Sequence, residues 1–237
     1  MSAVRSVLTY LVTLAYIAVA GPLGLVIAVV FKWKSGLYAL GHGGVWLALT
    51  CAGIRYRVAG RENVPARAVV FCSNHESNVD PPVLFQALHR RLHILYKAEL
   101  HKFPIMGVVF DVGGFVPIER GNREQSMASI SRGAASLKAG NSFLIFPEGT
   151  RSRTGELLPF KKGGFIMALQ ANAPVVPVAI SGGRASMRKG SPWVRPVRVS
   201  VRIGTPISTE GMTVADRDRL ISSVRDQIQQ LLQQGPV

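Results

Sequence analysis

The sequence has few cysteines and few acidic residues. Its two cysteines, Cys51 and Cys72, lie in apolar stretches of the 237-residue chain. This argues against a secreted disulfide framework and fits buried thiols in a reducing compartment. Aspartate and glutamate number 13 against 28 lysines and arginines, so the net charge is +15. An excess of that size indicates an anionic partner: nucleic acid, anionic lipid or a phosphorylated substrate.

Charged residues of both signs are also scarce, at 17%, whereas hydrophobic residues make up 48%. High hydropathy combined with positive charge favours a membrane surface. No basic stripe is interleaved with aromatic residues, as it is in single-strand binders, so we expect no nucleic-acid partner. His89, His93 and His101 form the only loose histidine cluster and lack a cysteine or carboxylate at ligand spacing. We therefore expect no metal site.

The N-terminus holds the longest apolar run, Val7 to Phe31, which ends at the letters KWK. This length is enough to cross a bilayer as a helix. A cleaved signal peptide is the alternative, because Arg5 precedes the run and AVAG resembles a cleavage site. The run continues past that site through LGLVIAVVF, which favours a retained segment.

A second apolar stretch, Leu37 to Ile54, follows directly and leaves two interpretations. One is a spanning helix followed by a core helix. The other, which we favour, is a helical hairpin that dips into one leaflet and keeps its basic residues at one headgroup level: Arg5, Lys32, Lys34, Arg55 and Arg57. Basic residues at both ends of the pair place both ends, and the rest of the chain, on the cytoplasmic side of the inner membrane. We thus expect a membrane-anchoring segment over residues 1–53.

Residues 54–237 are expected to form an α/β domain. Short alternating or buried apolar runs predict strands near residues 54–60, 66–74, 92–97, 115–120, 142–147, 175–181 and 197–207. Helical periodicity, with proline starts and glycine stops, predicts helices near 80–91, 103–114, 122–140, 165–173 and 213–234. This alternation predicts a mixed, largely parallel sheet covered by helices.

The first candidate site is SNHESNVD, which follows a predicted buried strand. The loops at such strand ends are where α/β sheets place their sites. The spacing allows the Asp80 carboxylate to reach one ring nitrogen of His75, leaving the other nitrogen to accept a proton. Asp80 would also cap the helix that begins at Pro81. The alternative interpretation is an ordinary loop leading into that helix.

The second candidate site is FPEGTRSR, Phe146 to Arg153, at the end of another predicted strand. Arg151 and Arg153 place two guanidinium groups together, and arginine binds phosphate in a bidentate manner. Gly149 allows a turn that presents backbone amides to an anion. A solvated charged loop is the alternative.

Cationic residues follow further predicted strands. Arg120 ends GFVPIER, Lys97 ends LHILYK, and Lys161 and Lys162 precede a helix N-terminus that favours anions. Together these strand ends describe a phosphate site beside a general base.

Four ordered motifs now carry a family resemblance: NHESNVD, GFVPIER, FPEGTRS and VVPVAI, which run from Asn74 to Ile180. They resemble the membrane-bound glycerolipid acyltransferases, and within them most closely the lysophosphatidic acid (1-acylglycerol-3-phosphate) acyltransferases. Glu119 stands where many relatives have aspartate, which is a mild departure. The motifs cover roughly the middle half of the chain.

The resemblance implies that His75 deprotonates the substrate hydroxyl, that Asp80 orients it, and that the hydroxyl attacks an acyl thioester directly. The donor would be acyl-CoA or acyl-carrier protein, the acceptor lysophosphatidic acid, and no cofactor would be needed. The substrate-binding residues would be Lys97, Arg120, Glu148, Gly149, Thr150, Arg151, Arg153 and Lys162.

Three other interpretations stay open at this point. The same chemistry could act on glycerol-3-phosphate, another lysophospholipid or an amino-acid lysolipid such as lyso-ornithine lipid. The chain could bind lipid without catalysis, or it could use water in place of the acceptor hydroxyl as a thioesterase.

Overall fold

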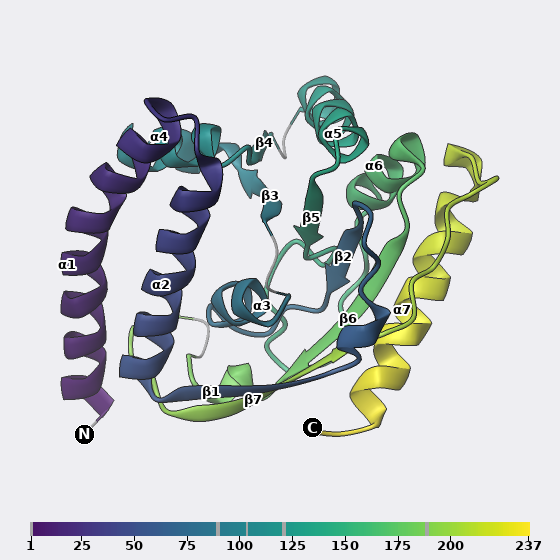
Figure 1. Ribbon diagram of the computed structural model, residues 1–237. Coiled ribbons are helices and arrows are strands. Elements are labelled where there is room, and N and C mark those ends of the chain that lie inside the picture. Colours follow the sequence, from purple (N-terminus) through teal and green to yellow (C-terminus); the bar gives the residue numbers. More distant parts are fainter. Residues whose placement is uncertain (1, 89–90, 103, 120–121, 188–189) are drawn as a thin grey trace.

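The structure is a computed structural model that describes residues 2–88, 91–102, 104–119, 122–187 and 190–237 (Figure 1). One seven-stranded sheet forms its centre. The strands are β1 (Ile54–Ala59), β2 (Val70–Ser73), β3 (Leu92–Lys97), β4 (Val116–Ile118), β5 (Ser142–Ile145), β6 (Val175–Ser181) and β7 (Val197–Ile203). The helices are α1 (Ser2–Val29), α2 (Lys34–Ala52), α3 (Asp80–Leu88), α4 (Pro104–Val112), α5 (Arg123–Lys138), α6 (Gly163–Ala171) and α7 (Arg217–Gln233).

The sheet is mixed and largely parallel, which confirms the predicted fold class. Its strand order is β1-β7-β6-β2-β5-β3-β4. β6 and β7 pair in the antiparallel direction, and the other described neighbours pair in parallel. The central strands β2 and β5 are buried along their whole length. Strands covered on both faces read as continuous apolar runs, which is why their sequences lack alternation.

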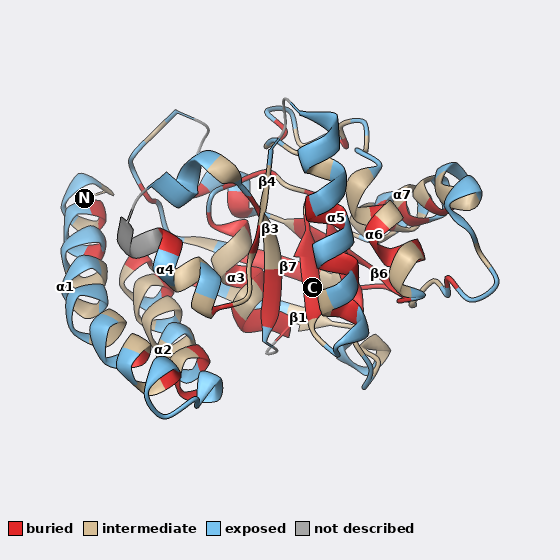
Figure 2. Ribbon diagram, turned by 90° about the horizontal axis from the view of Figure 1, so that it is seen from above, coloured by how far each residue is buried: buried red, intermediate tan, exposed pale blue. Residues whose placement is uncertain are grey.

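Helices cover both faces of the sheet, and the core has two halves (Figures 1 and 2). Successive residues of β2 divide between the halves because strand side chains alternate between faces. Phe71 packs with α2 and α3, whereas Val70 and Cys72 pack with α5, α6 and α7. α7 buries Leu220, Val224 and Ile228.

The C-terminal part of the chain confirms one local prediction and corrects another. Thr213 and Asp216 form a capping box in which the Asp216 carboxylate accepts the Thr213 N–H at 2.8 Å, one turn before α7. β7 is shorter than predicted and ends at Ile203. Ile207 pairs with Val175 only as an isolated bridge, so the chain leaves the sheet after Gly204.

The N-terminal stretch is an antiparallel pair of helices. The Tyr16 hydroxyl of α1 donates to the Leu40 carbonyl of α2 at 2.8 Å. α2 joins the core through Leu49 and Ala52. α1 is, within the described ranges, the one helix long and apolar enough to cross a membrane, with a mean hydropathy of 2.2.

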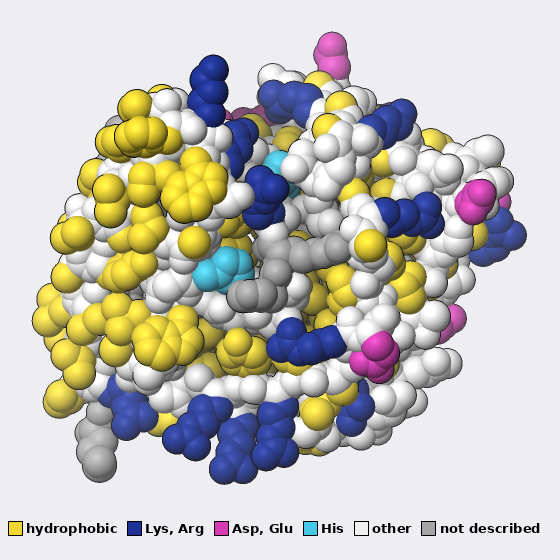
Figure 3. All heavy atoms as spheres, viewed as in Figure 1, with side chains coloured by type: hydrophobic (Ala, Val, Ile, Leu, Met, Phe, Trp, Pro, Cys, Tyr) yellow, Lys and Arg dark blue, Asp and Glu magenta, His cyan; other side chains and the backbone are white. Residues whose placement is uncertain are grey.

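Most large apolar side chains of α1 face outward and form a broad hydrophobic surface over α1 and α2 (Figure 3). On α1 these are Val4, Val7, Leu8, Tyr10, Leu11, Leu14, Ile17, Val19, Leu23, Val26 and Val29. Monomeric soluble proteins rarely expose so continuous an apolar surface.

Candidate active site

The candidate site lies where three neighbouring strands end. β2 pairs in parallel with β5 on one side and with β6 on the other. The carboxyl ends of parallel strands meet at one edge of the sheet, so the loops after Ser73, Ile145 and Ser181 come together there. The two motifs NHESNVD and FPEGTRS, about 70 residues apart in the chain, therefore form one site.

His75 and Asp80 are paired within this site. Nδ1 of His75 lies 2.8 Å from Oδ2 of Asp80. The Asp80 side chain is fully buried, whereas 16% of the His75 side chain is exposed. The imidazole stacks on Phe146 with ring centres 4.2 Å apart. Because a carboxylate can only accept, Nδ1 carries the proton and Nε2 is the basic nitrogen.

The predicted helix cap is wrong, and the reason is local. Asp80 is itself the first residue of α3, and its Oδ2 turns back to accept the N–H groups of Glu76 and Ser77, both at 2.7 Å. Two prolines follow Asp80 and have no N–H to offer. The next N–H, of Val83, bonds to the carbonyl of Val79 at 3.0 Å. Oδ2 of Asp80 thus bonds to the loop backbone and to His75, not to an N–H of α3.

Glu148 holds the backbone of His75 rather than facing solvent. Its Oε1 accepts the His75 N–H at 2.8 Å and its Oε2 accepts the Leu158 N–H at 3.0 Å. The Ser152 N–H in turn donates to the His75 carbonyl at 2.8 Å. Burial raises the pKa of Glu148 above its ordinary value, although both backbone N–H groups act to lower it. The sequence predicted Glu148 in a phosphate pocket, whereas in the structure its carboxylate holds the backbone of the His75 loop.

Further positioning residues escaped sequence reasoning. Asn74 bonds twice to Ile180 of β6, with the side-chain N–H donating and the side-chain oxygen accepting, each at 2.8 Å. Oε1 of Glu76 accepts the Arg184 N–H at 3.2 Å. A Cβ on Gly183 would lie 2.6 Å from Oδ1 of Asp80, so the backbone must approach closely there. Asn74 and Glu76 lie within the NHESNVD motif and Gly183 in the pair Gly182-Gly183, but the partners of these residues are distant in the sequence.

Arg151 has a buried donor atom without a partner in the part of the chain that the structure describes. Its Nη1 is buried and has no hydrogen-bond partner among the described residues. A buried unpaired donor on a cation is unfavourable unless a ligand meets it. Arg151 directly precedes Ser152, whose N–H bonds to the His75 carbonyl, so the backbone of Arg151 lies next to the His75 loop.

A lysine lies over the turn before Arg151. Gly149 has φ +67°, which favours glycine, and the Lys161 side chain lies over it. A Cβ on Gly149 would come 2.8 Å from Nζ of Lys161. Thr150 is exposed in the same turn. Lys161, rather than Lys162, is therefore the lysine at the FPEGTRS loop.

The remaining predicted residues are spread more widely. Arg153 is exposed, and its carbonyl accepts from Nη1 of Arg184 at 2.9 Å. Lys97 ends β3 and pairs with Glu99 at 2.8 Å. Lys162 pairs with Asp218 of α7 at 3.3 Å. Arg120 lies outside the described residues.

The cysteines offer no nucleophile at this site. Cys72 is fully buried in β2, and burial raises the pKa of its thiol well above the ordinary value, so it stays protonated. Cys51 is only half-buried, contrary to the predicted pair of buried thiols. No group of three or more His, Cys, Asp and Glu side chains in the described part of the chain could hold a metal ion.

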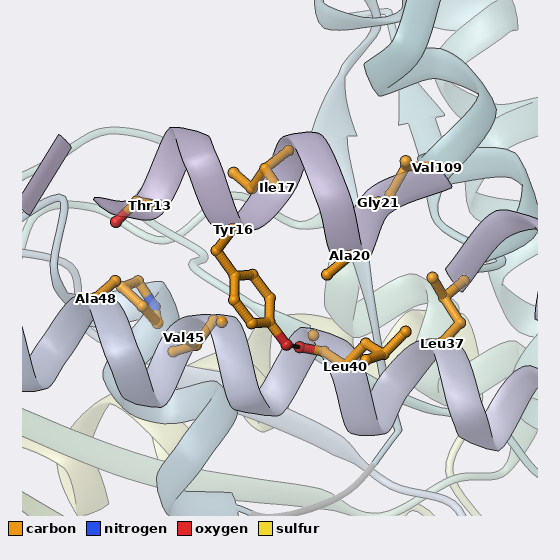
Figure 4. Close-up of a pocket in the computed structure, with 13 residues that line it drawn as sticks. Thr13, Tyr16, Ile17, Ala20, Gly21, Leu37, Leu40, Val45, Ala48 and Val109 are labelled. Carbon is orange, nitrogen blue, oxygen red and sulfur yellow. Dashed lines mark hydrogen bonds between the residues drawn. The ribbon is translucent and has the colours of Figure 1, made fainter. Parts of the chain in front are cut away.

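An apolar cavity of about 730 Å³ opens between α1 and α2 (Figure 4). Tyr16 projects across it toward Leu40, and Ile17, Ala20 and Val45 line it. Pro82, two residues after Asp80, also lines it, so the cavity reaches the start of α3. A cavity of this size and lining suits an apolar ligand.

The arrangement combines an oriented base, a buried cationic donor and a nearby apolar cavity. The base can remove a proton from a hydroxyl, and the cation can bind an anionic group.

Comparisons with known proteins identify the family of this chain. A family model described as Acyltransferase matches residues 55–181. A 1-acyl-sn-glycerol-3-phosphate acyltransferase of Limnanthes douglasii is 32% identical over 210 residues, which cover 86% of this chain and 74% of that protein. One of Pseudomonas aeruginosa is 31% identical over 217 residues, covering 89% and 83%.

The fold is also known from a crystal structure. The 1-acyl-sn-glycerophosphate (LPA) acyltransferase PlsC of Thermotoga maritima matches with a TM-score of 0.80 at 24% identity, covering 97% of this chain and 95% of that one. At that identity the likeness shows the fold alone. From the family match and the sequence relatives, we conclude that the chain belongs to the acyltransferase family and is an O-acyltransferase.

Proposed function

We propose that the protein transfers a fatty acyl group from an acyl thioester to the free hydroxyl of lysophosphatidic acid, which yields phosphatidic acid. The observation that carries the proposal is the buried Nη1 of Arg151, unpartnered among the described residues, in the loop whose Ser152 N–H bonds to the carbonyl of the Asp80-paired His75. Relatives that cover most of this chain are named as acyltransferases for the same acceptor.

In the proposed mechanism His75 is the general base. Its Nε2 removes the proton from the acceptor hydroxyl, and the oxygen attacks the thioester carbonyl carbon. As the C–S bond breaks, the imidazolium returns the proton to the leaving thiolate. Asp80 stabilises the imidazolium and holds the ring in the productive tautomer. Because a thioester is already activated, no acyl-enzyme is required, in keeping with the protonated thiol of Cys72.

Arg151 binds the acceptor phosphate in this proposal. A phosphate oxygen would satisfy the Nη1 donor, and the low exposure would strengthen the pairing. Gly149 and Thr150 shape the turn, and Lys161 adds a second cation over it. We retain Arg120 as a phosphate ligand from the family resemblance, with Arg153, Lys97 and Lys162 as outer cations.

Membrane attachment through α1 and α2 is part of the proposal. A helix perpendicular to the bilayer would carry its two ends to opposite surfaces. Both halves of α1, however, lie against the α/β part. Ser6 accepts the Val194 N–H at 2.8 Å near one end, and Gly21 shares the apolar cavity with Val109 of α4. This favours a helix pair lying along one leaflet with the outward face of α1 in lipid.

The same orientation accounts for the basic residues around the pair. Arg5 and Arg55 lie at one end of the α1–α2 pair, whereas Lys32 and Lys34 flank the turn at its other end. The two ends are about 40 Å apart, because α1 rises about 1.5 Å per residue. All of them reach one headgroup level only if both helices lie along the membrane surface, here the cytoplasmic face of the inner membrane.

We assign the apolar cavity between α1 and α2 to an acyl chain. A chain that stays in lipid or in such a cavity avoids about 0.8 kcal/mol of unfavourable exposure per methylene. The hydroxyl and phosphate would then meet His75 and Arg151 at the headgroup level. The donor is acyl-CoA or acyl-carrier protein, and no further cofactor is invoked.

The proposal is tested with purified protein in lipid nanodiscs, acyl-CoA and a panel of acceptors, by following release of free thiol. We expect thiol release to depend on lysophosphatidic acid and to fall at least 100-fold in His75→Ala, which removes the base. His101→Ala removes a histidine outside both motifs, whose Nδ1 lies 2.7 Å from the Tyr96 hydroxyl, and serves as the matched control.

Three outcomes would contradict the proposal. Thiol release at the same rate without acceptor would indicate a thioesterase. Transfer to glycerol-3-phosphate or another lysolipid in preference to lysophosphatidic acid would reassign the acceptor. Unchanged transfer in His75→Ala would exclude the general-base mechanism.

A further inference from the structure

A groove with three arginines lies at the open end of the α1–α2 pair, and none of its lining residues belongs to the NHESNVD or FPEGTRS motifs. It has a volume of about 560 Å³, and Arg5 of α1, Arg55 of β1 and Arg198 of β7 line it, together with Gly53 and Pro196. In Figure 3 a row of Lys and Arg side chains borders the hydrophobic surface of α1 and α2 from below.

The groove concentrates charge that the protein does not balance. Arg55 and Arg198 are direct neighbours across the parallel β1–β7 pair, and both are exposed. Like charges directly opposite each other destabilise a sheet. In the described part of the chain no carboxylate lines the groove, and the guanidinium groups of Arg5, Arg55 and Arg198 form no hydrogen bond or ion pair.

The backbone makes room for this cluster. Gly53 ends α2 with φ +70°, and a Cβ there would lie only 2.6 Å from Nη1 of Arg5. The guanidinium group of Arg5 therefore lies against the turn that leads into β1, within the same groove as Arg55. A residue other than glycine would strain the turn and displace Arg5.

We propose that this groove binds the phosphate of an anionic membrane phospholipid, at a site distinct from the one that holds the acceptor. Guanidinium groups suit phosphate oxygens, and three of them without an acidic neighbour match an anionic headgroup. The proposal rests on the membrane attachment proposed above and names its lipid contact.

The position of the groove favours lipid over an acidic protein partner. Arg5 lies in the first turns of α1 between Val4 and Leu8, whose side chains are 74% and 54% exposed. A bilayer that takes up these apolar side chains brings its headgroups against Arg5 and the groove beside it. An acidic protein docking on the groove would leave that apolar face in water.

Vesicle co-flotation tests the proposal. Wild-type protein is mixed with phosphatidylcholine vesicles that either lack or contain phosphatidylglycerol. We expect the wild-type protein to bind the anionic vesicles more tightly, and salt to weaken this binding. In R5Q/R55Q/R198Q the preference for anionic vesicles should fall by on the order of 100-fold, because each arginine contributes about fivefold. Each exposed single variant, such as Arg198→Gln, should lose about fivefold.

The matched control removes the same charge elsewhere. K138Q/R217Q/R219Q lies on α5 and α7, on the opposite face of the sheet from α1, and should retain the preference (Figure 1). Acyl transfer to a short-chain acceptor in detergent should be unchanged in the groove variants. A failure of the proposed function would abolish that transfer in the wild type as well, so the two failures are distinguishable.

Several results would overturn the proposal. An equal loss in both triple variants would show that net charge alone sets the preference. If the wild-type protein bound equally well to vesicles with and without phosphatidylglycerol, the groove would not recognise an anionic phospholipid. Release from vesicles by inorganic phosphate, but not by sodium chloride of equal ionic strength, would assign the groove to free phosphate. If the groove variants lost acyl transfer from acyl-carrier protein in detergent but still bound anionic vesicles normally, the groove would instead bind acyl-carrier protein.

Discussion

Replacing Asp80 by asparagine should lower the rate of acyl transfer while leaving the free energy of unfolding nearly unchanged. Oδ2 of Asp80 accepts three hydrogen bonds, from Nδ1 of His75 and from the N–H groups of Glu76 and Ser77. In Asp80→Asn the amide oxygen can still accept from the two backbone groups. The neutral amide, however, can no longer stabilise an imidazolium at His75 as the carboxylate does.

The magnitude follows from these contacts. General-base catalysis contributes about 10²- to 10⁴-fold, so kcat should fall by that factor, or about 2.7–5.4 kcal/mol of activation free energy. Asp80→Ala should lose as much activity. It should also leave two buried N–H groups without partners, at about 1–3 kcal/mol each, and so lower the free energy of unfolding by roughly 2–6 kcal/mol.

Steady-state kinetics with purified protein in nanodiscs and denaturant unfolding are the two assays. The expected pattern is equal loss of kcat in both variants, with stability lowered mainly in Asp80→Ala. An Asp80→Asn variant that retained kcat within a few-fold of wild type would refute the reasoning, since the carboxylate charge would then be dispensable.

Three further predictions test the same structure. Arg151→Gln should raise KM for lysophosphatidic acid by about 10- to 100-fold, through loss of a charge-assisted hydrogen bond, while KM for the acyl donor stays constant. Gly183→Ala should lower kcat at least tenfold, because its Cβ would lie 2.6 Å from Oδ1 of Asp80 and displace that carboxylate. Burial lowers the pKa of His93 to about 4, and the positive charges of Lys34 and Arg91 contribute to this shift. The neutral imidazole therefore contributes fully to the free energy of unfolding above pH 6.5, and this contribution is lost as the pH falls through 4. Denaturant titrations should show about 3 kcal/mol of that loss, absent in His93→Gln.

Controls make these outcomes decisive. Ala185→Ser alters an exposed position in the turn that contains Gly183 and should be silent. Equal changes in KM for both substrates in Arg151→Gln would argue against a phosphate contact. A Gly183→Ala variant with normal kcat would show that the Asp80 loop tolerates displacement. A His93→Gln variant with the full pH dependence would assign the titration to other groups.

Some parts of the site were predictable because their signals are local. A histidine and an aspartate at the end of a buried strand indicated an oriented base. Glycine and arginine after another such strand indicated an anion site. The strands themselves were predictable because their apolar runs are bounded by proline, glycine and polar residues.

Other parts depended on contacts between distant segments. Glu148 reads as a pocket residue, yet it bonds to the backbone of His75 because β2 and β5 are neighbours in the sheet. Asp80 reads as a helix cap, yet its carboxylate serves the loop. Lys161 and Lys162 are equivalent in sequence, but one lies over Gly149 and the other pairs with Asp218.

The sequence by itself determined the elements, the apolar N-terminal pair and the two chemical motifs, because helix periodicity, strand burial and turn chemistry act over a few residues. Only the tertiary structure decided which loops meet, that Glu148 holds the backbone of His75, and which arginine has a buried atom without a partner in the described residues. It also brought Arg5, Arg55 and Arg198 into one groove. Strand order and helix packing set these distances, and neither is encoded within a short segment.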